Sequence, residues 1–369
     1  MRPWLALALL SCALFLALVA RFYHPGVGFS ALIVMSRDQE ERRLPALRAI
    51  PHYTYGRDME YDGAQYVQLA MVPLLRDPAI DRAIDAPAYR ARRILFCWTA
   101  YALGLGRPAW ILQAYALQNV LAWLILAWFT TRWFPLTSWR SFALWFASMF
   151  SHGLLASVRL AVLDGPSLLL LALAVAASEK GRTWLAAVTL GIAGLGRETN
   201  LLGAAAQPWP RGWRGWLRAA AAALVVAFPL LVWQDYVWSI YRSTNDGVEL
   251  ITLPFSAYLA EWNRTIRGSA LFLFNRKTLA LVALTAQVAY LAWTRNWSSP
   301  WWRLAAAYAA LLFVVATAVW EGYPGAITRV VLPLKLGFNV LLAQGQPRGF
   351  WAWFALGNLD LAMSIDVLT

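Results

Sequence analysis

The chain of 369 residues is too apolar for a soluble globular protein. Hydrophobic residues make up 60% of it and charged residues only 14%, whereas soluble chains carry roughly 25% charged residues. Its net charge is +13, and in a membrane protein such an excess of Lys and Arg belongs in the short loops that orient the helices. Composition therefore predicts an all-α polytopic integral membrane protein, with membrane lipids and no nucleic acid as partners.

The first segment, residues 1–20, is an apolar run that follows Arg2. A cleaved signal peptide would need a small residue at the first position of its cleavage site, and Leu18-Val19-Ala20 lacks one. We expect an uncleaved transmembrane helix with its N-terminus in the cytoplasm.

The longest polar stretch comes next, and we expect it to form the first extracytoplasmic loop, residues 21–108. Its last part, residues 94–106, is apolar but spans only 13 residues, fewer than the roughly 20 needed to cross a bilayer. We expect an interfacial helix there, on the same side of the membrane as the loop.

Further spans are expected along the rest of the chain, for a total of about ten or eleven transmembrane helices. No linker or repeat separates a second domain, so residues 1–369 are expected to form one membrane domain with a second extracytoplasmic loop at 235–277. The expected spans are 109–131, 141–158, 166–178, 184–196, 217–234, 278–294, 301–320, 326–343 and 350–366.

The charges of the short loops favour one topology. If the segments 132–140, 179–182, 208–218, 295–303 and 344–349 are cytoplasmic, they hold many Lys and Arg but only one acid, Glu179, as the positive-inside rule requires. This arrangement needs residues 197–207 to turn back as a short half-helix. In the alternative, 94–106 and 184–206 both span, which moves several arginines outside and buries Arg197 and Glu198.

An acidic cluster, Asp58, Glu60 and Asp62, lies in the first extracytoplasmic loop within YGRDMEYDGAQYVQLA (55–70). If this segment is extended, the three side chains share one face, repel each other and favour a bound metal or arginine. Gly63 permits a sharp turn into a following helix, which Asp62 would begin. No cofactor is certain, and a divalent metal is a candidate; the alternative role of Asp62 is a helix N-cap.

Four further ionisable residues lie in or beside apolar runs, where charge is costly and usually functional. Asp164 follows Arg159 and begins an apolar segment, which permits a simple helix-end pair or a functional role. Arg197 and Glu198 stand together deep in an apolar run and need distant partners. Arg329 offers the planar fork that suits phosphate, or it anchors a helix at the interface.

Three motifs resemble those of bacterial cell-surface glycopolymer formation proteins, a family similar to the GT-C superfamily of integral-membrane glycosyltransferases. They are YDGAQYVQLA (61–70), DP (77–78) and DAPAYRARRIL (85–95). Ala64 and Val67 depart from the pattern, which otherwise matches at Asp62, Gly63, Tyr66, Asp77, Pro78, Asp85, Pro87, Tyr89, Arg90 and Arg93.

The resemblance implies an extracytoplasmic enzyme that transfers a sugar from a polyprenyl-phosphate-linked donor to a cell-surface glycan or lipid-linked acceptor. A base for the acceptor hydroxyl and cations for the leaving phosphate are what such a transfer needs. Asp62 is the candidate base, supported by Asp58 and Glu60, with Asp164 as another catalytic candidate. Candidate substrate- and phosphate-binding residues are Arg93, Arg197, Arg329, Tyr66, Tyr89 and Glu198.

Two other functions remain open. A flippase or transporter of lipid-linked sugars would line a path through the bilayer with polar groups, which instead gather toward one side of the membrane. A non-catalytic subunit of a glycopolymer assembly complex would keep the fold without the activity. Under any of these functions, the loop 235–277 is expected to cover the site, because it carries Asp235, Asp246, Glu249 and Glu261.

The topology is testable by site-specific cysteine labelling in intact cells. Residues near 45, 164 and 250 are expected to react from outside, and residues near 136, 213 and 299 only after the membrane is opened. Position 164 separates the two arrangements, and labelling of that position from the cytoplasm would contradict the preferred one.

Overall fold

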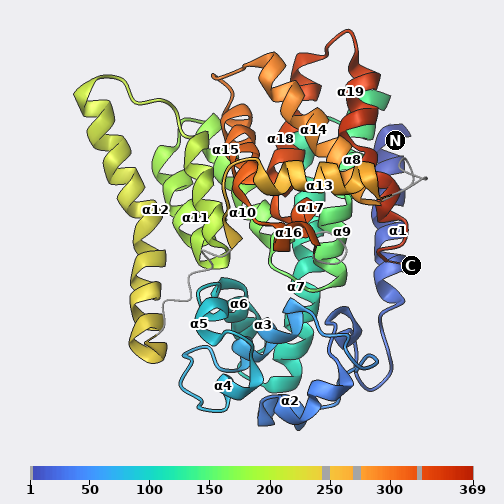
Figure 1. Ribbon diagram of the computed structural model, residues 1–369, viewed down its shortest axis with the longest axis vertical. Coiled ribbons are helices and arrows are strands. Elements are labelled where there is room, and N and C mark those ends of the chain that lie inside the picture. Colours follow the sequence, from blue (N-terminus) through green and yellow to red (C-terminus); the bar gives the residue numbers. More distant parts are fainter. Residues whose placement is uncertain (1–2, 243–249, 269–275, 322–325, 369) are drawn as a thin grey trace.

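The computed structural model describes residues 3–242, 250–268, 276–321 and 326–368, and these form packed helices (Figure 1). Within these ranges there is no β-strand, only three isolated bridges. A tall helical body occupies most of the molecule, and a group of short helices covers its lower end in Figure 1. The prediction of an all-α fold is confirmed for the described residues.

The short helices at the lower end belong to residues 21–107, which we call the loop layer. Its last helix, α6, has nine residues and rises about 13 Å, less than half of a bilayer core. It packs against α3 within the layer and against α7 of the body. The elements of the layer are η1 (Ser30–Leu32), η2 (Arg37–Arg42), α2 (Pro45–Arg48), α3 (Asp62–Met71), α4 (Ile80–Ala83), α5 (Pro87–Ala91) and α6 (Leu95–Leu103).

The helical body contains the remaining elements. They are α1 (Pro3–Ala20), α7 (Pro108–Phe129), η3 (Thr130–Arg132), α8 (Trp139–Met149), α9 (His152–Arg159), α10 (Asp164–Glu179), α11 (Thr183–Gly196), η4 (Glu198–Ala206), α12 (Gly212–Tyr241), α13 (Ser256–Arg267), α14 (Arg276–Thr294), α15 (Pro300–Val314), α16 (Thr317–Glu321), α17 (Ala326–Val330), α18 (Leu332–Gly345), α19 (Phe350–Gly357) and η7 (Leu359–Ser364).

Fewer helices than predicted are long enough to cross a membrane by themselves. Among the described residues, α1, α7 with its extension η3, and α12 are long and apolar enough, and α8 with α9 makes a fourth if the bent pair is one span. The helices α11 and α15 are apolar but shorter. The expected ten or eleven spans thus exceed the number that length and composition support.

Several predicted spans are broken rather than continuous. The predicted helix 141–158 is two helices, α8 and α9, bent by 41° at Phe150 and Ser151. The break leaves carbonyl groups without helical partners, and the Trp123 indole donates a hydrogen bond to the Met149 carbonyl at 2.8 Å. The predicted spans 301–320, 326–343 and 350–366 are likewise two helical pieces each.

The helix α12 is longer than predicted, and this changes the second predicted loop. It covers residues 212–241 instead of 217–234, so the loop expected at 235–277 begins inside a helix and also contains α13. Asp246 and Glu249 lie outside the described residues. Of the loop residues that the structure describes, Leu250 reaches the cavity described below.

Residues 197–207 turn back along the body as the short half-helix that was predicted. η4 begins beside Asp164, the first residue of α10, through the contact of Arg197. It ends beside the last turn of α10, where the Ser178 hydroxyl donates to the Ala206 carbonyl at 2.9 Å. The chain therefore crosses the length of α10 between these points and enters α12 from the end opposite the loop layer.

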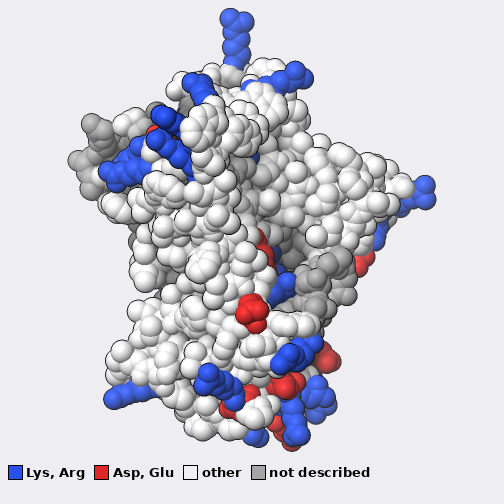
Figure 2. Space-filling model, turned by 90° about the vertical axis from the view of Figure 1, so that its left-hand side faces the viewer, with Lys and Arg blue, Asp and Glu red and all other residues white. Residues whose placement is uncertain are grey.

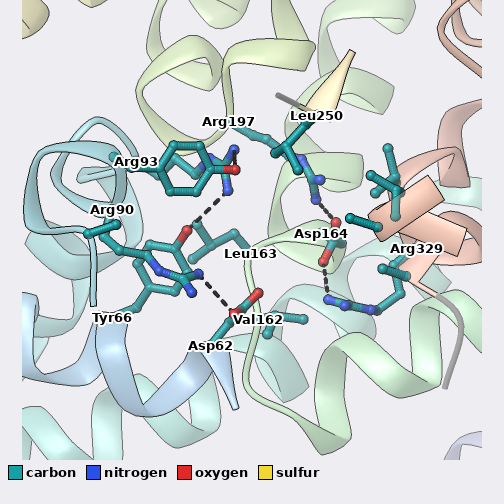
Figure 3. A pocket seen from close by; sticks show the side chains of 16 residues that line it. Asp62, Tyr66, Arg90, Arg93, Val162, Leu163, Asp164, Arg197, Leu250 and Arg329 are labelled. Atoms are coloured by element: carbon teal, nitrogen blue, oxygen red, sulfur yellow. Dashed lines mark hydrogen bonds and ion pairs between the residues drawn. The ribbon is translucent and has the colours of Figure 1, made fainter. Parts of the chain in front are cut away.

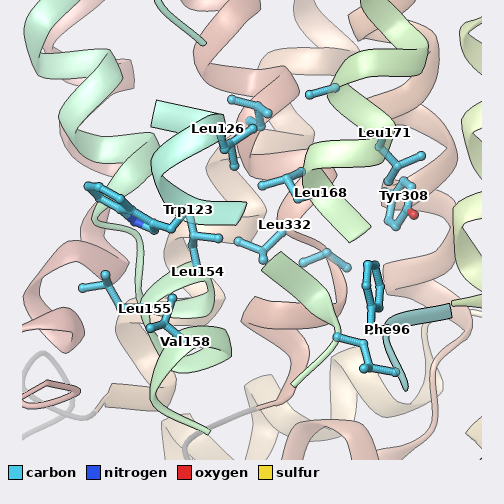
Figure 4. Close-up of a cluster of buried hydrophobic side chains, with 14 of the residues drawn as sticks. Phe96, Trp123, Leu126, Leu154, Leu155, Val158, Leu168, Leu171, Tyr308 and Leu332 are labelled. Carbon is cyan, nitrogen blue, oxygen red and sulfur yellow. The ribbon is translucent and has the colours of Figure 1, made fainter. Parts of the chain in front are cut away.

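A continuous apolar core holds the body and the loop layer together. Figure 4 shows part of it, where side chains of α6, α7, α9, α10, α15 and α18 meet. Trp123 of α7 is 1% exposed and stacks on Phe15 of α1 at a ring distance of 3.7 Å. Phe96 of α6 belongs to the same core, which fixes the loop layer against the end of the body where the charged residues gather.

Candidate functional site

A cavity of about 400 Å³ lies between the loop layer and the helical body. Figure 3 shows side chains from both parts pointing into it. On the face drawn in Figure 2, acidic and basic side chains are visible inside a hollow of the surface. It is lined by Asp62, Tyr66, Ala86, Tyr89, Arg90, Arg93, Val162, Leu163, Asp164, Arg197, Leu250, Ala318, Val319, Ala326, Arg329 and Val330.

Asp62 begins α3, as predicted, and its carboxylate faces the cavity. Tyr61 takes the N-cap position, so Asp62 is the first helical residue rather than the cap. Its carboxylate pairs with the Arg90 guanidinium at 2.9 Å and keeps 39% of its side chain exposed. Arg90 in turn donates two hydrogen bonds to Asp85, at 2.9 and 3.1 Å, which hold it in place.

Gly63 has a different role from the predicted turn. Its backbone is helical within α3, and a Cβ atom there would lie 2.4 Å from the Leu160 carbonyl oxygen. Only glycine allows this close approach of α3 to the turn between α9 and α10. That contact brings Asp62 to the same cavity as Asp164.

The electrostatic surroundings keep Asp62 ionised. Burial would raise the pKa of this carboxyl, but the positive charges of Arg90 and Arg329 outweigh burial and hold the pKa below its usual value. A carboxylate of this kind accepts a proton weakly, so it suits a reaction whose leaving group departs easily.

Asp164 joins two arginines that are far apart in the sequence. It begins α10, and its carboxylate pairs with Arg197 after α11 and with Arg329 of α17, the latter at 3.0 Å. Asp164 and Arg329 are each only 5% exposed. Arg159 does not join them, because it donates instead to the Tyr55 hydroxyl at 3.0 Å. Of the two alternatives that the sequence left open for Asp164, the helix-end pair with Arg159 therefore does not form.

Arg93 forms the third charged contact at the cavity. Its guanidinium donates to the Tyr66 hydroxyl at 3.2 Å, the Tyr89 hydroxyl at 2.7 Å and the Glu198 carboxylate at 2.9 Å. Arg92 lies 3.5 Å from the same carboxylate. Glu198 therefore has the distant partners that its apolar surroundings predicted.

Asp58 and Glu60 do not join Asp62, and the predicted acidic face does not form. Asp58 adopts a left-handed backbone conformation, with φ 60°, which ends the alternation that a shared face needs. Its side chain is exposed. Glu60 pairs with the buried Arg43 at 3.1 Å and accepts from the Ser36 amide at 2.6 Å, so it stabilises the loop layer.

The candidate metal ligands are consequently separated. Among the described residues, no three His, Cys, Asp or Glu side chains come together as a metal site. In the cavity the two carboxylates, Asp62 and Asp164, both bind guanidinium groups instead.

Among its described residues, the predicted covering loop contributes Leu250 to the cavity. Leu250 lines it and accepts a hydrogen bond from the Ala316 amide at 2.8 Å, at the break between α15 and α16. Glu261 of α13 is buried and pairs with Arg264 at 2.9 Å. Asp235 lies within α12, outside the cavity lining.

Arg90 and Tyr61 are site residues to which the sequence assigned no role, although both lie in the motifs that carry the family resemblance. Arg90 links Asp62 to Asp85, and the Tyr61 hydroxyl accepts a hydrogen bond from Arg329. A signal for Arg90 existed in DAPAYRARR, where it precedes Arg93 by three residues and so shares its side of a helical turn. The signal for Tyr61 was its place as the first residue of the motif YDGAQYVQLA (61–70).

The described part of the lining carries more guanidinium than carboxylate groups. Four arginines and two aspartates among the described residues face the cavity. Guanidinium groups present planar pairs of N–H donors that match phosphate oxygens. The arrangement is suited to binding a phosphate group beside a carboxylate.

Comparison with known proteins identifies no relative. No family model, curated protein or solved structure matches the chain.

We predict that the carboxylate of Asp164 is essential for stability. Asp164→Asn leaves Arg197 and Arg329 without a shared counter-charge, and losing one member of a buried ion pair costs about 3–5 kcal/mol. Asp85→Asn is the matched control, because its side chain is 62% exposed and surface pairs contribute about 0–1 kcal/mol. Thermal unfolding of the purified proteins measures the difference, and equal melting temperatures would contradict the prediction.

Proposed function

We propose that the protein is a multi-pass membrane enzyme of the bacterial inner membrane with a GT-C-like architecture and a cytoplasmic N-terminus. The apolar helices support this proposal, as does the excess of Lys and Arg in the short loops expected to be cytoplasmic. The broken helices are compatible with it, because irregular backbone is tolerated at membrane depth where protein surrounds it. The loop layer would then face outward.

The activity we propose is transfer of a sugar from a polyprenyl-phosphate donor to a cell-surface glycan or lipid-linked acceptor. The observation that carries the proposal is the meeting of Asp62 with four arginines around one cavity. The motifs at 61–70, 77–78 and 85–95 add the resemblance, and their residues Asp62, Tyr66, Tyr89, Arg90 and Arg93 all line this cavity.

In the proposed reaction the acceptor oxygen attacks the anomeric carbon of the donor sugar. The acceptor hydroxyl gives its proton to the Asp62 carboxylate, the new glycosidic bond forms, and the bond from the anomeric carbon to the phosphate oxygen breaks. The polyprenyl phosphate leaves with the bonding electron pair. Guanidinium groups placed beforehand stabilise the charge that develops on its oxygens.

The charged residues divide this work between them. Arg197 and Arg329 are the proposed phosphate ligands of the body, and Arg93 with Tyr66 and Tyr89 is that of the loop layer. Asp164 serves as the counter-charge that holds Arg197 and Arg329 in place, rather than as a base, because both arginines occupy its carboxylate.

Asp62→Asn separates chemistry from folding. Arg90 keeps its two hydrogen bonds to Asp85, so the variant is expected to fold and to bind donor, yet to lose transfer by about 10²- to 10⁴-fold because the amide is a poor proton acceptor. The measurement is sugar transfer from a polyprenyl-phosphate donor, with Asp58→Asn as the control expected to retain activity, because the Asp58 side chain is exposed and does not line the cavity. Transfer by Asp62→Asn at the wild-type rate would rule out Asp62 as the base.

A further inference from the structure

Arg329 sits on a helix too short to hold itself in place. α17 has five residues, 326–330, and isolated helices of this length are unstable in water. Arg329 itself is bound at one end of its side chain, through Asp164 at 3.0 Å and through the Tyr61 hydroxyl. The backbone of α17 therefore needs support from a neighbouring element.

The support comes from α9, which packs against α17. A Cβ atom at Gly153 would lie 2.2 Å from the Thr328 carbonyl oxygen, so the two backbones touch. One residue earlier, the His152 imidazole makes a 2.9 Å hydrogen bond between its Nδ1 and the Thr328 hydroxyl. His152 is 0% exposed and Thr328 is 7% exposed.

The His152 imidazole lowers the stability of the fold at this place. Its other nitrogen, Nε2, is buried and has no hydrogen-bond partner among the described residues, and an unsatisfied buried polar atom destabilises the fold. A phenyl ring would fill the same space without that cost. The contact with Thr328 is what the histidine provides and a phenyl ring does not.

Arg329 in turn has a donor to spare. Its Nε–H is buried and has no partner among the described residues, while its two terminal nitrogens bind Asp164 and Tyr61. Arg329 also lines the cavity, so an anionic oxygen bound there meets its guanidinium only if α17 holds the side chain at the right depth.

We propose that His152 is a positioning residue for the anion site: through Thr328 it fixes α17, so that Arg329, which lines the cavity, presents its guanidinium to a phosphate oxygen. The inference rests on the proposed function in one respect, that the anion is the phosphate of a prenyl-linked donor. The contact between His152 and Thr328 itself is independent of that function.

The test uses farnesyl phosphate as the probe and measures its dissociation constant with the full-length purified protein. His152→Phe and Thr328→Val each remove the same hydrogen bond, and each is expected to weaken binding by about fivefold, the effect of one ordinary hydrogen bond. The double variant is expected to bind no more weakly than either single variant. Neither change is expected to weaken binding further in an Arg329→Gln background.

The conservative variant distinguishes positioning from packing. An Asn side chain places a polar atom near the position of the histidine Nδ1, so His152→Asn is expected to bind within about twofold of wild type, since it can keep most of one hydrogen bond. If His152 only fills space, His152→Phe will bind better than His152→Asn, and the proposal is overturned. Ser151→Ala is the matched control, because it removes a buried 3.0 Å hydrogen bond to Ser148 that does not touch α17, and it is expected to bind as wild type does.

A second readout needs no ligand and keeps the two proposals apart. If the wild-type protein binds no farnesyl phosphate, the proposed donor site is wrong, and the positioning role is then decided by melting temperatures of His152→Phe, Arg329→Gln and the double variant. If the double variant lowers the melting temperature by less than the sum of the two single variants, His152 positions Arg329 through α17. If the decreases in melting temperature of the two single variants simply add up in the double variant, the positioning role is overturned.

Discussion

The charged site depends on one carboxylate, that of Asp164, which two arginines share. Arg197 follows α11, Arg329 belongs to α17, and Asp164 begins α10, so one buried cluster joins three parts of the helical body. Burying any one of these charges without a partner would cost much free energy. They lie in the interior because each guanidinium is paired with the carboxylate of Asp164. The same contact turns both guanidinium groups toward the cavity, where the loop layer closes over them.

The loop layer supplies the other half of the site by the same means. Arg90 and Arg93 are held by Asp85 and Glu198, and Asp62 stands between the two groups of arginines. Gly63 brings this half against the turn before α10. A reaction that moves a sugar away from a phosphate needs a carboxylate and several cations within one cavity, and each of the two parts places one aspartate and two arginines in the described lining.

The sequence predicted local features of this arrangement well. The all-helical fold, the start of a helix at Asp62 and the return of the chain after Arg197 follow from hydrophobic patterning and from the cost of burying charge, both of which are local. The predicted face of three acids did not form. Alternate residues share a face only where the backbone is extended, and the left-handed conformation of Asp58 interrupts such a backbone. Glu60 was then free to bind Arg43.

The contacts that build the site could not be read from the sequence. Asp164 and Arg329 are 165 residues apart, and only the packing of α9, α10 and α17 brings them together. Breaks within predicted spans were missed for a similar reason, because side chains of other helices, such as Trp123, satisfy the freed backbone groups. Charge in an apolar run indicated that Arg197, Glu198 and Arg329 needed partners, without naming them.

The most direct test of the central claim is to incubate the purified protein with a panel of polyprenyl-phosphate sugars and a cell-surface glycan acceptor. The account predicts that at least one donor releases polyprenyl phosphate as its sugar appears on the acceptor. Movement of an intact lipid-linked sugar across a vesicle membrane, with no release of polyprenyl phosphate from any donor, would contradict it.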